Sequence, residues 1–148
     1  MKMKITIFRP FYVLLAAILA SACGLSHAQQ AAAPDPNTWL DAAQRAVQMI
    51  DQNDAGKLWD GGSAEMKRRV VKKEFIASIK KLRGAEAVSA RDWMSIDRTQ
   101  IAGQSQVPAG RYVNVRFRAA LGKREVTELV TFRQEPDGAW RWMGYLIE

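Results

Sequence analysis

Hydrophobic and polar residues alternate between Tyr112 and Leu121. The odd-numbered positions are apolar, whereas most of the even-numbered positions carry polar or charged side chains. An alternation with a period of two is typical of a strand that buries one face. The pattern therefore predicts a strand whose odd-numbered positions face the core.

The next two residues, Gly122-Lys123, suit a two-residue hairpin, because a type II′ turn has glycine at its first central position. Such a turn pairs Leu121 with Arg124 and brings the apolar faces of the two strands together. The same register places Glu128 opposite Phe117, on the apolar face.

A second turn is predicted at residues 136–138, where the sequence reads Pro-Asp-Gly. A loop of two or four residues would pair Phe132 with Met143 and Val130 with Tyr145. A three-residue loop with a bulge would instead turn the side chains of the last strand to the opposite face.

Helical periodicity precedes these strands. Residues 38–53 have apolar side chains three and four positions apart and begin with a capping-box-like threonine, so they predict a first helix. Glycines enclose a short helical turn around Trp59. Residues 63–84 predict a second helical region that a break near Val71 would divide. Residues 87–101 alternate again and predict the first strand of the sheet.

This order of elements indicates an α+β fold, with N-terminal helices packed on one face of a curved four-stranded antiparallel β-meander. A sheet that curves around helices often leaves a small pocket between the two layers. The simpler expectation is that aromatic side chains fill this space.

The first 28 residues have the features of an export signal. A basic start is followed by an apolar stretch at residues 11–25, which is too short to span a bilayer comfortably. Cleavage after Ala28 would release the mature protein into an oxidising compartment, the periplasm in a Gram-negative cell. We therefore predict a signal peptide at 1–28, a flexible tether at 29–37 and a single domain at 38–148.

Cys23 supports an alternative interpretation of the leader. The three residues before it resemble a lipobox, in which the cysteine is acylated and anchors the chain to a membrane. Ala20 occupies the position where a lipobox usually has leucine, so cleavage after Ala28 is the prediction and a lipoprotein anchored at Cys23 is the alternative. Contact with a membrane is expected only for the lipoprotein. Cys23 is the only cysteine, so no disulfide can form within the chain.

The charge of the chain is modest once the leader is removed. The formal net charge is +7, but the leader holds three of the 22 basic residues and none of the 15 acidic residues. The mature chain then has 19 basic and 15 acidic residues, a net charge of +4. This balance gives no indication of a nucleic-acid partner.

Cleavage after Ala28 also removes His27, which leaves the mature chain without histidine or cysteine. Thiol nucleophiles, imidazole bases and zinc sites built on these residues are thereby excluded. The sequence has no glycine-rich phosphate loop either. We predict no cofactor and no metal site, and an enzyme is the less favoured interpretation.

Glu128 is the charged residue that the predicted register places on the apolar face, with Tyr145 diagonally opposite. A carboxylate in that setting needs a partner. One hypothesis makes Glu128 a general acid or base, or a ligand anchor, in a pocket that also contains Trp59. The other pairs Glu128 with Arg91 in a buried ion pair, and we favour it because unusual buried charges are often structural.

Two surfaces are candidate interaction sites. Basic side chains around the second helical region could attract anionic lipid headgroups or cell-wall polymers, but we favour a solvated helix face whose lysine stems cover the helix flanks. The sheet face away from the helices is predicted to be unusually apolar, which favours a homodimer. The basic residues are Lys67, Arg68, Arg69, Lys72, Lys73, Lys80 and Lys81, and the apolar residues are Leu129, Trp140, Trp142 and Leu146.

Residues at a set of positions spread over the predicted domain are similar to those of a known protein family. The positions are Trp59, Ser63, Phe75, Gly84, Arg91, residues 108–113, Glu128, Gly138, Trp140, Arg141, Gly144 and Tyr145. In these positions the chain resembles a bacterial family of small exported proteins known as domain of unknown function 4019. The resemblance implies an architecture similar to the nuclear transport factor 2-like or cystatin-like folds, and it brings no established activity or site.

The sequence thus favours an exported envelope protein that acts as a non-enzymatic binding or interaction module, with a small pocket between helices and sheet. A pocket enzyme that uses Glu128 is the alternative. Binding of anionic envelope polymers or lipids through the basic helix is a third hypothesis.

Overall fold

The computed structural model describes residues 34–103 and 107–148. Within these residues the chain forms four helices followed by four strands, which confirms the predicted α+β class. The strands form one antiparallel sheet in the order β1-β2-β3-β4, so the predicted meander is confirmed as well. The elements are α1 (Pro36–Asp51), α2 (Ala55–Asp60), α3 (Ala64–Arg69), α4 (Lys72–Arg83), β1 (Val88–Ile101), β2 (Gly110–Leu121), β3 (Arg124–Gln134) and β4 (Trp140–Ile147).

The predicted signal peptide, with Cys23, lies outside the described residues. None of the helices in the described part of the chain is both long and apolar enough to span a bilayer.

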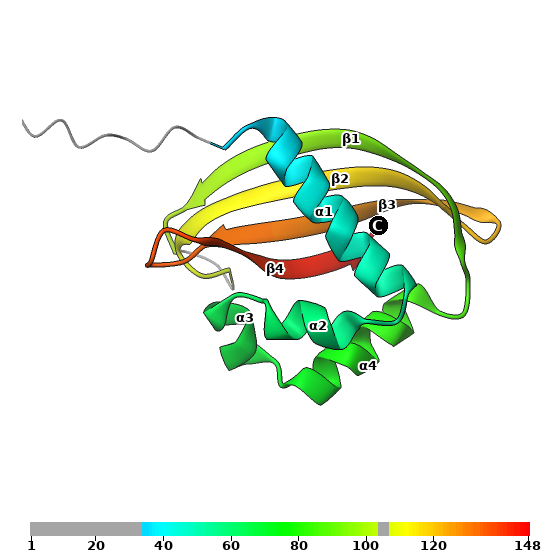
Figure 1. Cartoon of the computed structure of the whole chain (residues 1–148), viewed down its shortest axis with the longest axis horizontal. Helices are drawn as coiled ribbons and strands as arrows, with labels where there is room; N and C mark the ends of the chain where they lie inside the picture. Colours follow the sequence, from blue (N-terminus) through cyan, green and yellow to red (C-terminus); the bar gives the residue numbers. More distant parts are fainter. Residues whose placement is uncertain (1–33, 104–106) are drawn as a thin grey trace, which may run out of the picture. The chain divides into compact units, whose positions relative to one another are not determined.

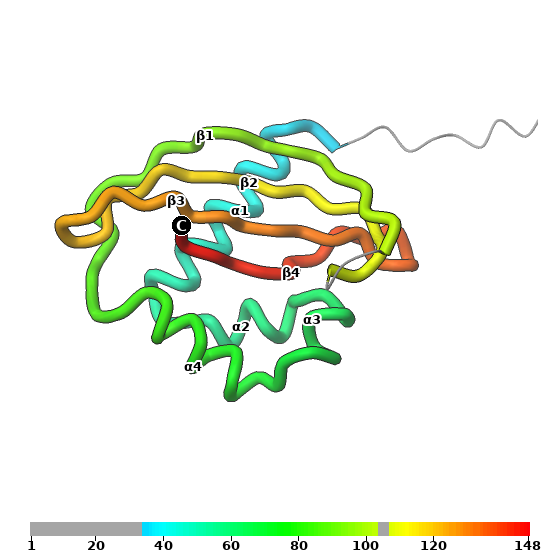
Figure 2. Tube along the Cα trace, turned by 180° about the vertical axis from the view of Figure 1, so that it is seen from behind, coloured from blue at the N-terminus to red at the C-terminus, as the bar shows by residue number. Residues whose placement is uncertain are grey.

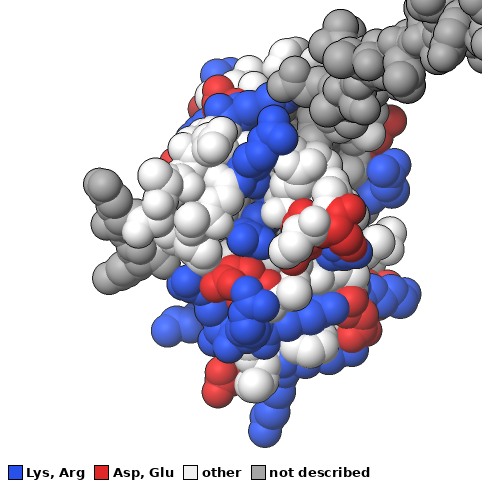
Figure 3. Space-filling model, turned by 90° about the vertical axis from the view of Figure 1, so that its left-hand side faces the viewer, with Lys and Arg blue, Asp and Glu red and all other residues white. Residues whose placement is uncertain are grey.

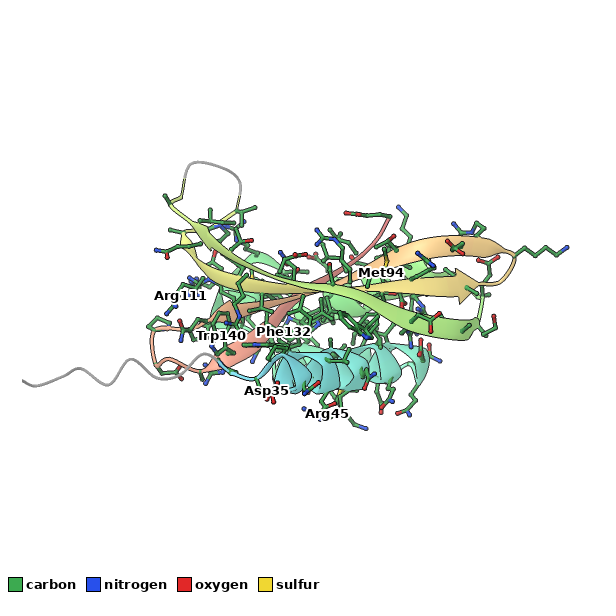
Figure 4. The ribbon with its side chains drawn as sticks, turned by 90° about the horizontal axis from the view of Figure 1, so that it is seen from above. Asp35, Arg45, Met94, Arg111, Phe132 and Trp140 are labelled. Carbon is green, nitrogen blue, oxygen red and sulfur yellow. The ribbon has the colours of Figure 1, made fainter. Side chains whose placement is uncertain are left out.

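The helices occupy two positions relative to the sheet. Helix α1 crosses one face, whereas α2, α3 and α4 lie beyond β4 (Figures 1 and 2). Trp39 and Val47 on α1 belong to the same buried cluster as Val115 on β2. Arg45 lies on the opposite side of α1 and points away from the sheet (Figure 4). The core therefore lies between the helices and the odd-numbered face of β2, as the alternation predicts.

Helix α1 begins at Pro36, two residues before the predicted start at Thr38. Asp35 caps it, because a carboxylate oxygen of Asp35 accepts a hydrogen bond from the backbone N–H of Asn37 at 3.0 Å. Proline suits the first helical position, where no N–H is needed and its φ is already helical. The predicted cap at Thr38 is therefore wrong, and the helix includes the last residues assigned to the tether.

The second helical region is divided at the predicted place. The Ser63 hydroxyl caps α3 by accepting a hydrogen bond from the backbone N–H of Glu65 at 3.1 Å. Val70 and Val71 have extended backbone conformations that separate α3 from α4. Gly84 ends α4 with a φ of 64°, a conformation that favours glycine.

The first hairpin has the predicted register. Leu121 pairs with Arg124 across the turn, and Phe117 pairs with Glu128 farther along the strands. Gly122 adopts a φ of 58°, which the turn requires. Glu128 is consequently on the core face, where its exposed fraction is 0%.

The second hairpin departs from the favoured register. Tyr145 pairs with Val130 as expected, but Phe132 pairs with Trp142 instead of Met143 because of an irregularity next to Phe132. This corresponds to the alternative with a three-residue loop and a bulge. Before the bulge, the side chains of β4 point to the opposite face from the one expected. From Gly144 onward they point to the expected face.

The three-residue loop and the bulge together bury Trp142 in the core and place Trp140, half-buried, against it. Trp142 is 5% exposed and packs edge-on against Phe75, with ring centroids 5.1 Å apart. Trp140 packs in the same way against Trp39, with centroids 4.8 Å apart. The predicted apolar outer face is therefore wrong for Trp140 and Trp142, whereas Leu129 and Leu146 pair on that face and Leu146 is largely exposed. The homodimer predicted through that face loses its basis.

Candidate functional site

Five side chains from five elements meet in the interior, and we call them the buried charge cluster. Asp51 is the last residue of α1 and Arg83 the last residue of α4. Arg91, Glu128 and Tyr145 come from β1, β3 and β4. Glu128, Arg83 and Tyr145 are buried, whereas Asp51 keeps about a third of its side chain exposed (32%).

Glu128 is the centre of this cluster. Its Oε1 accepts hydrogen bonds from Arg83 Nη1 at 2.5 Å and from the Tyr145 hydroxyl at 2.6 Å. Its Oε2 accepts a hydrogen bond from Arg91 Nε at 2.5 Å. The expected ion pair between Glu128 and Arg91 is therefore present, and Arg83 and Tyr145 add two further donors.

Asp51 joins the two arginines from the other side. It accepts hydrogen bonds from Arg83 Nη2 at 2.5 Å and from Arg91 Nη1 at 2.9 Å. Two carboxylates thus face two guanidinium groups, so the ionised charges cancel. Buried charges are tolerated when they are paired and hydrogen-bonded in this way. The cluster joins the ends of two helices to three strands.

The surroundings of Tyr145 and Arg91 in the cluster determine the protonation states of these two side chains. Burial raises the pKa of the Tyr145 hydroxyl far above its usual value, and the hydrogen bond to Glu128 raises it further. Burial alone would lower the pKa of Arg91, but its hydrogen bonds to Glu128 and Asp51 outweigh burial and raise that pKa. Tyr145 is therefore a neutral hydrogen-bond donor, and Arg91 a permanent cation, over the physiological pH range.

Among the described residues, two apolar grooves adjoin β4, and both are lined by residues 143–146. The helix-side groove has a volume of about 370 Å³ and lies against α3 and α4. The outer groove, about 400 Å³, lies on the other side of the strand. The helix wall of the first groove consists of Met66, Val70, Phe75, Ser78, Ile79 and Leu82; the remaining wall of the second consists of Thr99, Ile101, Val107, Tyr112, Asn114 and Thr131.

The expected pocket residues are divided between these places. Tyr145 lines both grooves and also reaches the buried charge cluster through its hydroxyl. Glu128 and Arg91 line neither groove. Of the four residues predicted to share a pocket, Tyr145 alone lines the helix-side groove, and the predicted acid does not open into it.

The comparison with known families agrees with the resemblance in the sequence. The family described as protein of unknown function (DUF4019) matches residues 42–145. The chain belongs to this DUF4019 family. The matched region includes every member of the buried charge cluster and both walls of the helix-side groove except Leu146. No curated protein matches the sequence.

Trp59 lies apart from the cluster in this DUF4019 protein. Its indole N–H donates a hydrogen bond to the backbone carbonyl of Val70 at 3.1 Å. The ammonium of Lys67 lies 5.3 Å from the centroid of the Trp59 ring. Trp59 therefore braces α2 against the junction of α3 and α4, and it lines neither groove.

The basic residues of α3 and α4 are partly neutralised. Arg68 and Arg69 both pair with Glu65, and Lys72 pairs with Asp60 at 2.7 Å. Blue and red side chains accordingly alternate over the end of the molecule that Figure 3 presents. Lys67 donates a hydrogen bond to the backbone carbonyl of Asp60 at 2.6 Å. No salt bridge with the described residues is formed by the other three basic residues, Lys73, Lys80 and Lys81.

Sequence reasoning missed Arg83 and Asp51 as members of the cluster. Both carry a weak signal, because each continues an apolar helical stripe at a spacing of four residues. Arg83 follows Ile79 on α4, and Asp51 follows Val47 on α1. A charged residue in phase with a buried stripe indicates that it has a buried partner. In the described part of the chain, no three residues of the metal-ligating types histidine, cysteine, aspartate and glutamate lie together.

Proposed function

We propose that this protein is a non-enzymatic binding module that holds an apolar ligand in the helix-side groove. The observation that carries the proposal is the groove itself. Its helix wall is apolar apart from Ser78, and Leu82 and Leu146 at its border are exposed. Its volume of about 370 Å³ falls within the range of ligand sites in proteins.

The state of Glu128 supports binding rather than catalysis. A general acid or base must come within hydrogen-bond reach of a substrate. Glu128 is completely buried, and both of its oxygens already accept hydrogen bonds from cluster members. Water or substrate could reach this carboxylate only if the cluster opened.

Binding of a neutral apolar dye, N-phenyl-1-naphthylamine, tests the groove. We expect the dye to become fluorescent in the wild-type protein. We also expect Ser78→Phe to weaken the binding at least about tenfold, because the ring would fill the groove from the helix wall. Fluorescence titration of both proteins measures the difference.

Ala77→Phe is the matched control. Ala77 is the neighbouring exposed residue on α4 and does not line the groove, so this variant should bind the dye as the wild type does. An equal loss in both variants, or no binding by the wild type, would contradict the proposal.

We further propose that the protein acts in the cell envelope after export. The basic start, the apolar stretch and the cleavage site at Ala28 support this. We expect osmotic shock to release a mature form that begins at Gln29, and Cys23→Ser to leave this release unchanged. Mass spectrometry of the released protein measures its N-terminus. A membrane-bound, acylated form that Cys23→Ser abolishes would contradict release and establish the lipoprotein.

A further inference from the structure

We propose that the free edge of β4 binds an extended, acidic segment of a partner protein as an added strand, with alternate side chains of the segment in the helix-side groove. This inference rests on the proposed function, because it states what kind of ligand the same groove holds. The proposal follows from the backbone of β4, from the helix-side groove beside it and from the charge of α3 and α4.

The backbone of β4 has hydrogen-bonding groups that face away from the sheet. Thr127 and Glu148 exchange two hydrogen bonds, each 2.9 Å long. Hydrogen-bonded and non-hydrogen-bonded pairs alternate along an antiparallel ladder. Leu146 therefore bonds to β3, whereas Tyr145 and Ile147 direct their N–H and C=O groups outward. These outward groups have no partner among the described residues.

The free edge has a definite beginning. The backbone carbonyl of Trp142 accepts a hydrogen bond from the N–H of Ser63 at 2.7 Å, so the start of α3 covers the edge there. Beyond that point β4 is the last strand of the sheet. The open stretch ends with the strand at Ile147. It therefore suits a short segment that forms a few main-chain hydrogen bonds, the mode in which an extended peptide joins a sheet edge.

The helix-side groove matches one set of side chains of such a segment. Successive side chains of a strand point to opposite faces. The helix-side groove lies between residues 143–146 of β4 and the helices, whereas the outer groove extends from β4 over β3, β2 and β1. An added strand would therefore place one set of side chains against Phe75 and Leu82 and the next set on the outer face. Gly144 leaves room between them, because a Cβ built there meets no atom within 4 Å.

The charge of α3 and α4 indicates what kind of segment would bind beside β4. Residues 64–83, which form the helix wall, contain eight basic residues, and four of these pair with carboxylates. The four that form no salt bridge with the described residues are Lys67, Lys73, Lys80 and Lys81. Lys81 adjoins Leu82 of the groove and has no salt bridge with the described residues. This field favours an acidic segment. A second copy of the chain, paired edge to edge through β4, would instead bring two basic helix pairs together.

The test uses a synthetic peptide in which valine and threonine alternate between two pairs of aspartates. Amide hydrogen exchange of the labelled protein is measured by NMR with and without saturating peptide. We expect the amides of Tyr145 and Ile147 to become protected at least about tenfold, because they acquire partners only in the complex. The amides of Gly144 and Leu146 face β3 in both states, so they are internal controls that should change much less. Binding without protection of Tyr145 and Ile147 would overturn the added strand.

Two further comparisons test the charge of the partner segment and the use of the groove separately. A peptide with lysines in place of the aspartates should bind at least about tenfold more weakly at low salt, and the difference should shrink as salt is added. Equal binding of the two peptides would overturn the acidic partner. Ser78→Phe should weaken peptide binding and Ala77→Phe should not, and equal effects would overturn the use of the groove.

The remaining outcomes distinguish this inference from the proposed function. If the wild type binds the apolar dye at Ser78 but no peptide, the added strand is wrong and the apolar site stands. If it binds neither, both are wrong. Protection of Tyr145 and Ile147 without peptide, together with a dimer in light scattering, would overturn the partner segment in favour of a second copy.

Discussion

Replacing Glu128 by glutamine is expected to lower the free energy of unfolding by about 3 to 5 kcal/mol. The substitution removes one of two carboxylates that face Arg83 and Arg91, and so leaves an uncompensated positive charge in the interior. A small domain has a total stability of about 5 to 15 kcal/mol, so the variant should unfold at a much lower urea concentration. Urea denaturation followed by tryptophan fluorescence measures this change.

Glu125→Gln provides the matched control for this substitution. Glu125 lies on the same strand, its side chain is 76% exposed, and its nearest partner, Arg118, is 3.6 Å away. Surface pairs of this kind contribute little, so we expect a change within about 0.5 kcal/mol. A Glu128→Gln variant as stable as Glu125→Gln would mean that the buried charge cluster does not hold the fold together.

A double-mutant cycle locates the coupling within the cluster. Combining Glu128→Gln with Arg83→Met should give a non-additive energy of about 0.5 to 3 kcal/mol, because the two side chains share a hydrogen bond. The same cycle with Arg91→Met tests the hydrogen bond between Arg91 and Glu128. Additive effects in both cycles would contradict direct pairing.

The sequence predicted three of the five members of this cluster, Glu128, Tyr145 and Arg91, and the reason is local geometry. The turn at Gly122 fixes the register of β2 and β3, which places Glu128 on the core face. Arg91 could be proposed because the first strand neighbours the second in a meander. Arg83 and Asp51 reach Glu128 and Arg91 only because the ends of α4 and α1 converge there. No turn or pattern in the sequence specifies how two helix ends approach a sheet.

The sequence predicted a small pocket between helices and sheet, but it did not predict a groove beside β4. Its position depends on the packing of α3 and α4 beyond the edge of the sheet, which the amphipathic pattern of α4 does not determine. The apolar stripe of α4 predicts that Phe75 and Ile79 are buried, and both are. The pattern does not indicate that Leu82, farther along the same stripe, remains exposed at a groove.

The last strand shows how one residue changes a prediction. Residues 136–138 permit loops of different lengths, and the sequence does not determine which one forms. The backbone N–H of Glu135 bonds to the carbonyl of Ala139 at 2.8 Å, which closes a three-residue loop. Since strand side chains alternate, the loop and bulge together move Trp142 from the expected outer face to the core.

The burial of Trp142 yields the second large expected effect. Trp142→Ala should lower the free energy of unfolding by about 3 to 5 kcal/mol, because a large aromatic side chain leaves a cavity in the core. The side chain is 5% exposed and packs against Phe75. Its indole N–H has no hydrogen-bond partner among the described residues, so the substitution removes packing and no hydrogen bond. Urea denaturation again measures the loss.

Trp93→Ala makes the same chemical change on the surface of β1, where Trp93 is 58% exposed. We expect it to alter the free energy of unfolding by no more than about 0.5 kcal/mol. The comparison therefore measures burial alone, because the two variants lose identical atoms. If Trp142→Ala is as mild as Trp93→Ala, the bulge is misplaced and Trp142 faces solvent. In that case the apolar outer face, and a homodimer through it, would again be the better explanation of this strand.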